Sequence, residues 1–258
     1  MDTELLDTVR QLLEEKVRMY NRTEFIRADP IQVPHQFDRR ENIEIAAFLT
    51  ATIAWGRRDT IIRNALDLMS RMDHDPYAFL MNLTSDDLNV FSGFRHRTFN
   101  EQDCRFFIQS LHEIYKNKGG LYRVFLEGYS GKRSVMHAIL GFRDIFLGIK
   151  HSPRTEKHLA DPLTGSAAKR LNMFLRWMIR QDANGVDFGI WEKISPADLY
   201  IPLDIHTGNV ARKLGLLKRN QNDWKAVEEL TGVLRAFDPS DPVKYDFALF
   251  GLGIFENY

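Results

Sequence analysis

Residues 43–54 read Ile-Glu-Ile-Ala-Ala-Phe-Leu-Thr-Ala-Thr-Ile-Ala, and this stretch decides the fold. Wound as a helix, it is apolar on nearly every side, which is typical of a helix enclosed by others rather than of a surface helix. Gly56 follows closely and favours an end to the helix there. We therefore predict a central helix over about residues 41–54.

The rest of the chain shows the same kind of pattern. Apolar residues recur at helical spacing almost everywhere, and no segment has the period-two alternation of a strand. A first helix over about residues 2–20 places apolar side chains on one face and acids on the other. Further helices are expected at about 60–72, 76–82, 103–117, 120–127, 132–149, 166–181, 205–217, 222–236 and 242–255. The sequence therefore predicts an all-α fold.

Composition limits the possible functions. The chain has 258 residues, of which 44% are apolar and 27% charged, so a globular protein that folds alone is expected. Its 35 basic and 35 acidic residues cancel, so a site for a polyanion must be a local patch. Cys104 is the single cysteine, which excludes a disulfide within the chain and a four-cysteine zinc or iron–sulfur site. We predict no cofactor.

The expected location is the cytoplasm. No apolar run approaches the roughly 20 residues of a membrane span, and the N-terminal segment lacks the layout of a signal peptide. We predict no membrane association and no obligate protein partner.

Residues 202–217 form the most informative polar stretch. Pro202 fixes the entry angle, Asp204 is suited to cap the helix that follows, and Gly215 closes it. Asp204 is thus either a plain helix cap or a catalytic carboxylate, because both roles use one geometry. His206 lies close to Asp204, but no third ligand has suitable spacing, and we predict no metal site.

Several segments resemble, in order, those of the helix-hairpin-helix DNA glycosylases. Leu203-Asp204-Ile205-His206-Thr207 with Val210-Ala211-Arg212 is similar to their aspartate segment. Residues 164–175 are similar to their hairpin segment, in which a glycine turn opens a helix with the reactive lysine in its first turn. Lys169 falls on the matching position. Residues 44–55 and 245–253 resemble the apolar helix and the closing helix, so the resemblance covers most of 41–258.

The resemblance implies an enzyme that removes a damaged base, for example an oxidised purine. Its partner would be double-stranded DNA with a damaged or abasic nucleotide. Such enzymes take the base out of the stack. Lys169 would form a Schiff base with the sugar, and Asp204 would assist. The positive end of a helix and the adjacent Arg170 would disfavour the ammonium form of Lys169. The residues expected to contact DNA are Trp55, Arg57, Arg58, Arg95, Arg97, Gly165, Ser166, Arg170, His206 and Phe247.

The chain departs from the glycosylase pattern at the hairpin. The usual Leu-Pro-Gly-Val-Gly is replaced by Leu163-Thr164-Gly165-Ser166-Ala167, so we expect a degenerate hairpin. Lys169 and Asp204 are 35 positions apart, a spacing closer to that of archaeal 8-oxoguanine glycosylases. Residues 118–162 look like an insertion. The whole chain also resembles a bacterial family of unknown function.

The resemblance further implies one globular unit, 1–258, made of two lobes. Residues 42–182 would form the central lobe, and residues 1–41 with 183–258 the second lobe. Lys169 and Asp204 would face each other across a cleft between the lobes, with Trp55 at the bottom of the cleft. If the protein binds DNA, we expect it to be associated with the nucleoid.

Other interpretations stay open. Lys169 can be a solvated helix lysine, Trp55 and Phe247 can belong to the core, and Arg95-His96-Arg97 can be a solvated turn. A non-catalytic nucleic-acid or protein-binding module on this scaffold would place Lys169 and Asp204 more than about 10 Å apart. An enzyme acting on free nucleosides or modified RNA would keep the Lys169–Asp204 pair but lack the arginines expected to contact DNA.

Overall fold

The computed structural model describes residues 3–256 and 258, and nearly all of the regular structure in them is helical. The predicted all-α fold is confirmed. Contacts divide the chain into two compact units, of which unit 1 comprises Met1–Ile26 and Ala160–Tyr258 and unit 2 comprises Arg27–Leu159. The predicted start of the first helix, residue 2, lies outside the described residues.

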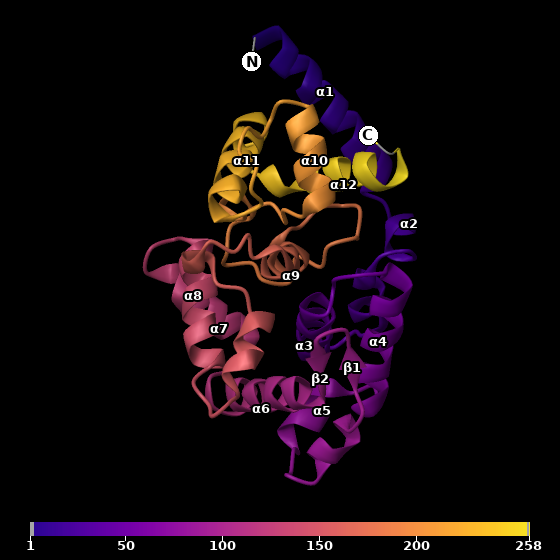
Figure 1. Ribbon diagram of the computed structural model, residues 1–258, viewed down its shortest axis with the longest axis vertical. Helices are drawn as coiled ribbons and strands as arrows, with labels where there is room; N and C mark the ends of the chain where they lie inside the picture. Colours follow the sequence, from indigo (N-terminus) through magenta and orange to yellow (C-terminus); the bar gives the residue numbers. More distant parts are fainter. Residues whose placement is uncertain (1–2, 257) are drawn as a thin grey trace. The chain divides into compact units, whose positions relative to one another are not determined.

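In the part of unit 1 that the structure describes, there are six α-helices (Figure 1). They are α1 (Thr3–Tyr20), α2 (Thr23–Ile26), α9 (Lys169–Ile179), α10 (Ile205–Lys213), α11 (Trp224–Phe237) and α12 (Tyr245–Phe255). Short 3₁₀ turns, η5 (Pro162–Thr164), η6 (Pro196–Asp198) and η7 (Pro242–Lys244), precede α9, α10 and α12.

Unit 2 contains the other α-helices of the described residues and one small hairpin. Its helices are α3 (Arg40–Thr52), α4 (Arg58–Arg71), α5 (Pro76–Met81), α6 (Glu101–Asn117), α7 (Leu121–Ser130) and α8 (Val135–Phe146). Its strands are β1 (Arg95–His96) and β2 (Phe99–Asn100), and its 3₁₀ turns are η1 (Pro30–Gln32), η2 (Pro34–Gln36), η3 (Asp87–Phe91) and η4 (Pro153–His158).

The predicted central helix is α3, and it forms the core of unit 2. Every residue of α3 from Asn42 to Thr52 is buried. Phe48 at its centre contacts the rings of Phe107 and Phe146, with centroid distances of 6.0 and 5.4 Å. Buried aromatic side chains contribute a large share of the hydrophobic stabilisation of a protein core, here that of unit 2.

The boundary between the units differs from the one predicted. The sequence suggested a central lobe over 42–182, whereas the structure groups residues 160–182 with the C-terminal third. The reason lies at α9, because Arg176 of this helix and Arg180, the residue directly after its end, are buried in ion pairs with Asp246 and Asp241 near the start of α12. These pairs fix α9 to unit 1.

Within unit 1, α12 packs against both α1 and α10. Most of α12 is buried, including Phe247, Leu249 and Leu252. Gly251 lets α1 approach closely, because a Cβ atom built there would lie 2.1 Å from Cδ2 of Tyr20. Thus α12 is the central helix of this unit.

Gly251→Ala is expected to destabilise unit 1 by about 1–3 kcal/mol, the usual cost of overpacking a core. The matched control is Gly232→Ala in α11, where a Cβ would meet nothing within 4 Å. This control should be neutral or should stabilise by up to about 1 kcal/mol, since alanine is the better helix former. Urea denaturation followed by circular dichroism measures both changes. Equal stabilities of the two variants would contradict the described packing of α1 on α12.

Among the described residues, none of the helices has the length and apolar character needed to cross a lipid bilayer.

Candidate functional site

Lys169 is the first residue of α9, so its predicted place in the first turn of a helix is confirmed. The turn before it contains two left-handed residues, Gly165 (φ 89°) and Ala168 (φ 45°). The hydroxyl of Ser166 accepts a hydrogen bond from the Ala168 amide at 3.2 Å. The short 3₁₀ turn η5 comes directly before this segment.

Asp204 caps α10, as predicted. Its Oδ1 accepts a hydrogen bond from the amide of Thr207 at 2.9 Å. Asparagine would make the same bond, because Asn and Asp cap helices about equally well. The cap therefore accounts for one oxygen of the carboxylate and leaves Oδ2 for another partner.

A short segment before α11 binds both of these helix starts. The side chain amide of Asn222 donates to the backbone oxygen of Asp204 at 3.0 Å. The next residue, Asp223, forms an antiparallel bridge with Ser166, and the amide of Trp224 donates to the Gly165 oxygen at 3.2 Å. Residues 222–224 thus hold the turn before Lys169 beside the start of α10. Sequence reasoning missed this link because it joins distant residues.

The Nζ atom of Lys169 lies 3.9 Å from Oδ2 of Asp204. The two side chains are 27% and 26% exposed, so a substrate can reach both. Nζ also lies 3.6 Å from the sulfur of Met173. The sequence predicted that Lys169 and Asp204 face each other from two different lobes, whereas the structure brings them together within unit 1. The alternative of a non-catalytic binding module predicted that the two side chains lie more than about 10 Å apart. The observed distance does not match that prediction.

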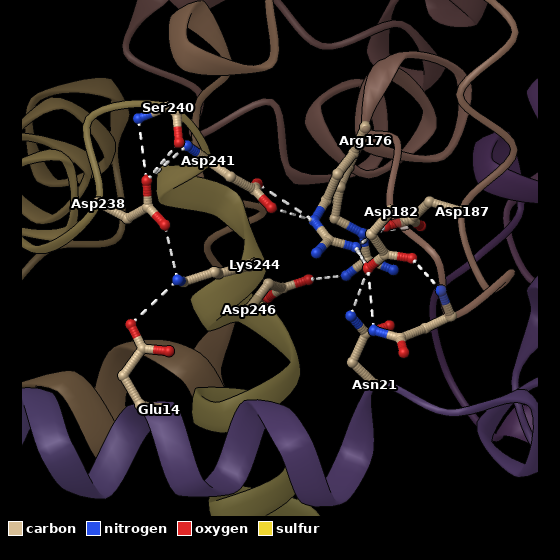
Figure 2. Close-up of polar contacts among 12 residues, drawn as sticks. Glu14, Asn21, Arg176, Asp182, Asp187, Asp238, Ser240, Asp241, Lys244 and Asp246 are labelled. Atoms are coloured by element: carbon tan, nitrogen blue, oxygen red, sulfur yellow. Dashed lines mark hydrogen bonds and ion pairs between the residues drawn. The ribbon is translucent and has the colours of Figure 1, made fainter.

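A buried ion-pair network joins α9 to the start of α12 (Figure 2). Arg176 of α9 pairs with Asp246 of α12, and its Nε lies 3.2 Å from Oδ1 of Asp187. Burial raises the pKa of Asp246 to about 6, although the positive charge of Arg176 opposes this shift. The negative charge of Asp204 also raises the pKa of Asp246.

Arg180, the residue directly after the end of α9, continues the network. Its guanidinium contacts three carboxylates, those of Asp182, Asp187 and Asp241, at 2.7, 3.1 and 2.9 Å. Burial alone would lower the pKa of Arg180, but these carboxylates outweigh it and raise the pKa. Burial raises the pKa of Asp187 and Asp241. The network was not predicted, because the arginines occur in an amphipathic helix and resemble surface residues in the sequence.

Phe247 does not belong to an exposed site. It is fully buried, and the guanidinium groups of Arg176 and Arg180 lie 4.3 and 5.3 Å from its ring centroid. Its predicted contact with DNA is therefore wrong, and its interpretation as a core residue is correct. Both buried guanidinium groups lie within cation–π distance of its ring.

The remaining predicted residues of unit 1 lie in the turn before α9, in the first turn of α9 and in the first turn of α10. Gly165 and His206 are exposed, and Ser166 and Arg170 are half-buried. Burial lowers the pKa of Arg170 to about 10. Gly165 and His206 are therefore accessible to a ligand.

The other predicted DNA contacts belong to unit 2, around the β1–β2 hairpin. Trp55 is half-buried, and its ring lies 4.8 Å from His96 and 5.9 Å from His158, so it is packed between two histidines. Arg97 (φ 54°) lies against Gly56, where a Cβ would be 3.0 Å from its Nη1. Two short segments, each with arginines, therefore lie side by side.

The arginines of this hairpin region form a basic patch. Arg57, Arg95 and Arg97 are exposed, and Arg58 is half-buried. The sequence suggested either a phosphate clamp or a solvated turn, and this exposure is compatible with both. The patch lies in unit 2 and the Lys169–Asp204 pair in unit 1, so the cleft that would join them stays a prediction.

Among the described residues, no three His, Cys, Asp or Glu side chains form a group that would hold a metal ion.

The fold and the site define a class of protein: an all-α chain with a partly exposed lysine–aspartate pair, each member at the start of a helix. Within this class, the chain belongs to the DUF2400 family, described as a protein of unknown function, whose model matches residues 29–255. No curated protein and no solved structure matches the chain.

Proposed function

We propose that this protein is a DNA glycosylase and abasic-site lyase that removes a damaged base, an oxidised purine in particular. The observation that carries the proposal is the distance of 3.9 Å between Nζ of Lys169 and Oδ2 of Asp204 at a partly exposed site. An ammonium and a carboxylate at this separation form an ion pair, and a small side-chain movement brings the two atoms to the hydrogen-bond distance at which a proton transfers.

In the proposed reaction, the neutral amine of Lys169 attacks C1′ of the deoxyribose. The N–C bond forms as the glycosidic bond breaks, and the base leaves with the bonding electrons. Asp204 accepts the proton that the nitrogen loses and returns it to the departing base, so the protons balance. Its negative charge also stabilises the positive charge that develops on the sugar. The reaction uses only side chains of the chain and needs no cofactor.

The sugar ring then opens, and the nitrogen and C1′ form a protonated Schiff base. In the lyase step, loss of a proton from C2′ breaks the C3′–O bond and releases the 3′ phosphate. The duplex carries one negative charge about every 1.7 Å of its axis, so basic side chains are needed to hold it. The exposed arginines of unit 2 are suited to this task, and the proposed substrate is chromosomal DNA in the cytoplasm.

Asp204→Asn separates catalysis from helix capping. Asparagine preserves the cap of α10, so the free energy of unfolding should change by less than about 0.5 kcal/mol. The loss of the charge and of the proton acceptor should slow base removal by about 100-fold or more. The assay is borohydride trapping on duplex oligonucleotides that contain 8-oxoguanine.

Asp204→Ala is the matched control, because it removes the cap as well and should cost about 1 kcal/mol of stability. If Asp204→Asn forms the trapped adduct at the wild-type rate, Asp204 is a helix cap and not a catalytic group. Salt-dependent DNA binding by a wild-type protein that never forms an adduct would favour the non-catalytic module instead.

A further inference from the structure

Two partners fix the orientation of the Asn222 side chain. Its Nδ2 donates to the backbone oxygen of Asp204 at 3.0 Å, and its Oδ1 accepts from Nη2 of Arg212 at 2.5 Å. Because a backbone oxygen only accepts and a guanidinium only donates, a single orientation of the amide satisfies both partners. Arg212 is itself held, since its Nε donates to the backbone oxygen of Arg219 at 2.8 Å. The amide of Asn222 is therefore a fixed contact with the start of α10.

Gly208, in the first turn of α10, leaves room for this amide. A Cβ atom built there would lie 2.8 Å from Oδ1 and 3.2 Å from Nδ2 of Asn222. Glycine is among the least favourable residues in a helix, and here it permits a contact that any larger residue would block.

The residue after Asn222 is bound to the turn before α9. Asp223 forms the antiparallel bridge with Ser166, and Nε of Arg219 donates to its carboxylate at 2.7 Å. The backbone oxygen of the same arginine holds Arg212. One network of hydrogen bonds therefore runs from the turn before α9 to the start of α10.

We infer that Asn222 is a positioning residue of the candidate site. Its amide fixes the start of α10 relative to the turn before α9, and this keeps Oδ2 of Asp204 within reach of Nζ of Lys169. Asn222 bonds the backbone oxygen of Asp204, so it acts on the carboxylate through the position of that residue. The consequence for base removal rests on the proposed function, whereas the placement of the two side chains does not.

Carbodiimide cross-linking of the full chain measures this placement without DNA. The reagent activates a carboxyl group, which then forms an amide with an amine in direct contact, and mass spectrometry quantifies the joined peptides of Lys169 and Asp204. In Asn222→Ala the yield of this cross-link should fall by about tenfold, because the rate of a reaction between two held groups depends steeply on their separation. The Lys16–Glu256 pair, 2.9 Å apart in the same unit, should keep its yield and serves as the internal reference.

Gly208→Ala is a second variant, which retains Asn222. The added methyl group displaces the amide from Asp204, so the cross-link should fall about as far as in Asn222→Ala. In the double variant the loss should be no larger than in either single variant, because both changes remove the same contact. Two independent weakenings of the fold would combine instead. If Asn222→Ala does not fold, a wild-type yield in Gly208→Ala overturns the inference by itself.

Asn209→Ala is the matched control, because Asn209 is an exposed asparagine of α10 next to Gly208. Its Lys169–Asp204 cross-link should form with the wild-type yield. A wild-type yield in a folded Asn222→Ala, an equal loss in Asn209→Ala, or a wild type that forms no such cross-link would overturn the inference.

A kinetic measurement connects the placement to the proposed function. In Asn222→Ala the rate of adduct formation at saturating DNA should fall by about tenfold while the Kd for DNA stays unchanged, since only the geometry of the reacting groups is altered. If the cross-link falls as expected but the wild type traps no DNA, the proposed function fails and the inference stands. If the wild type traps DNA but Asn222→Ala keeps the wild-type cross-link, the proposed function stands and the inference fails.

Discussion

Lys169→Gln should abolish the borohydride-trapped adduct, with a loss of at least about 100-fold relative to the wild type. Trapping requires a Schiff base between a primary amine and C1′, and glutamine has no such amine. The side chain of Lys169 is 27% exposed and contacts Asp204 and Met173, so its replacement should leave the fold intact. The measurement uses oligonucleotides that contain an abasic site or 8-oxoguanine, separated by denaturing gel electrophoresis.

The matched control is Lys225→Gln, which removes an exposed lysine from α11 in the same unit. It should form the adduct at the wild-type rate. A wild-type protein that forms no adduct with any lesion would remove the lyase proposal. An adduct that survives in Lys169→Gln would assign the nucleophile to another amine.

Arg180→Met should lower the free energy of unfolding of unit 1 by about 3–5 kcal/mol. The change leaves the buried carboxylate of Asp187 and the neighbouring Asp182 and Asp241 without the cation that they share. Removing one partner of a buried ion pair costs far more than the pair contributes, because an uncompensated charge stays in a medium of low polarity. Urea denaturation at pH 8 measures the loss.

The pH dependence of this loss has a definite sign. Burial already raises the pKa values of Asp187 and Asp241, and removal of Arg180 should raise them further. A carboxyl whose pKa is higher in the folded state than in the unfolded state favours folding at low pH, and this contribution is lost as the pH rises. The destabilisation should therefore shrink below about pH 5.

Arg22→Met is the control for this experiment, because Arg22 is an exposed arginine of unit 1 whose Nε donates to the backbone oxygen of Arg18. Its stability should stay within about 0.5 kcal/mol of the wild type. A loss of less than about 1 kcal/mol in Arg180→Met would contradict the buried network of Figure 2.

Much of the fold could be predicted from local patterns. The apolar run of residues 43–54 indicated a buried central helix, and α3 is buried from Asn42 to Thr52. The hairpin β1–β2 was expected to be a loop, because two residues per strand are too few to show alternation. The helix α2, with four residues, was missed for a similar reason.

The candidate site was predicted in part. Lys169 and Asp204 were chosen as a pair, and each occupies the predicted start of its helix. Asp246, Arg176 and the Asn222 side chain that bonds Asp204 were missed. Their importance arises from contacts with residues far along the chain, and no local pattern reports such contacts.

The sequence by itself determined the fold class, the helix positions and the cap at Asp204. These features depend on side chains within one or two helical turns, where periodicity and capping act directly. Only the tertiary structure decided that α9 belongs with the C-terminal third and that Lys169 lies beside Asp204. The physical reason is the pairing of buried charges, such as Arg176 with Asp246, which are 70 positions apart in the chain and meet only when α9 packs against α12.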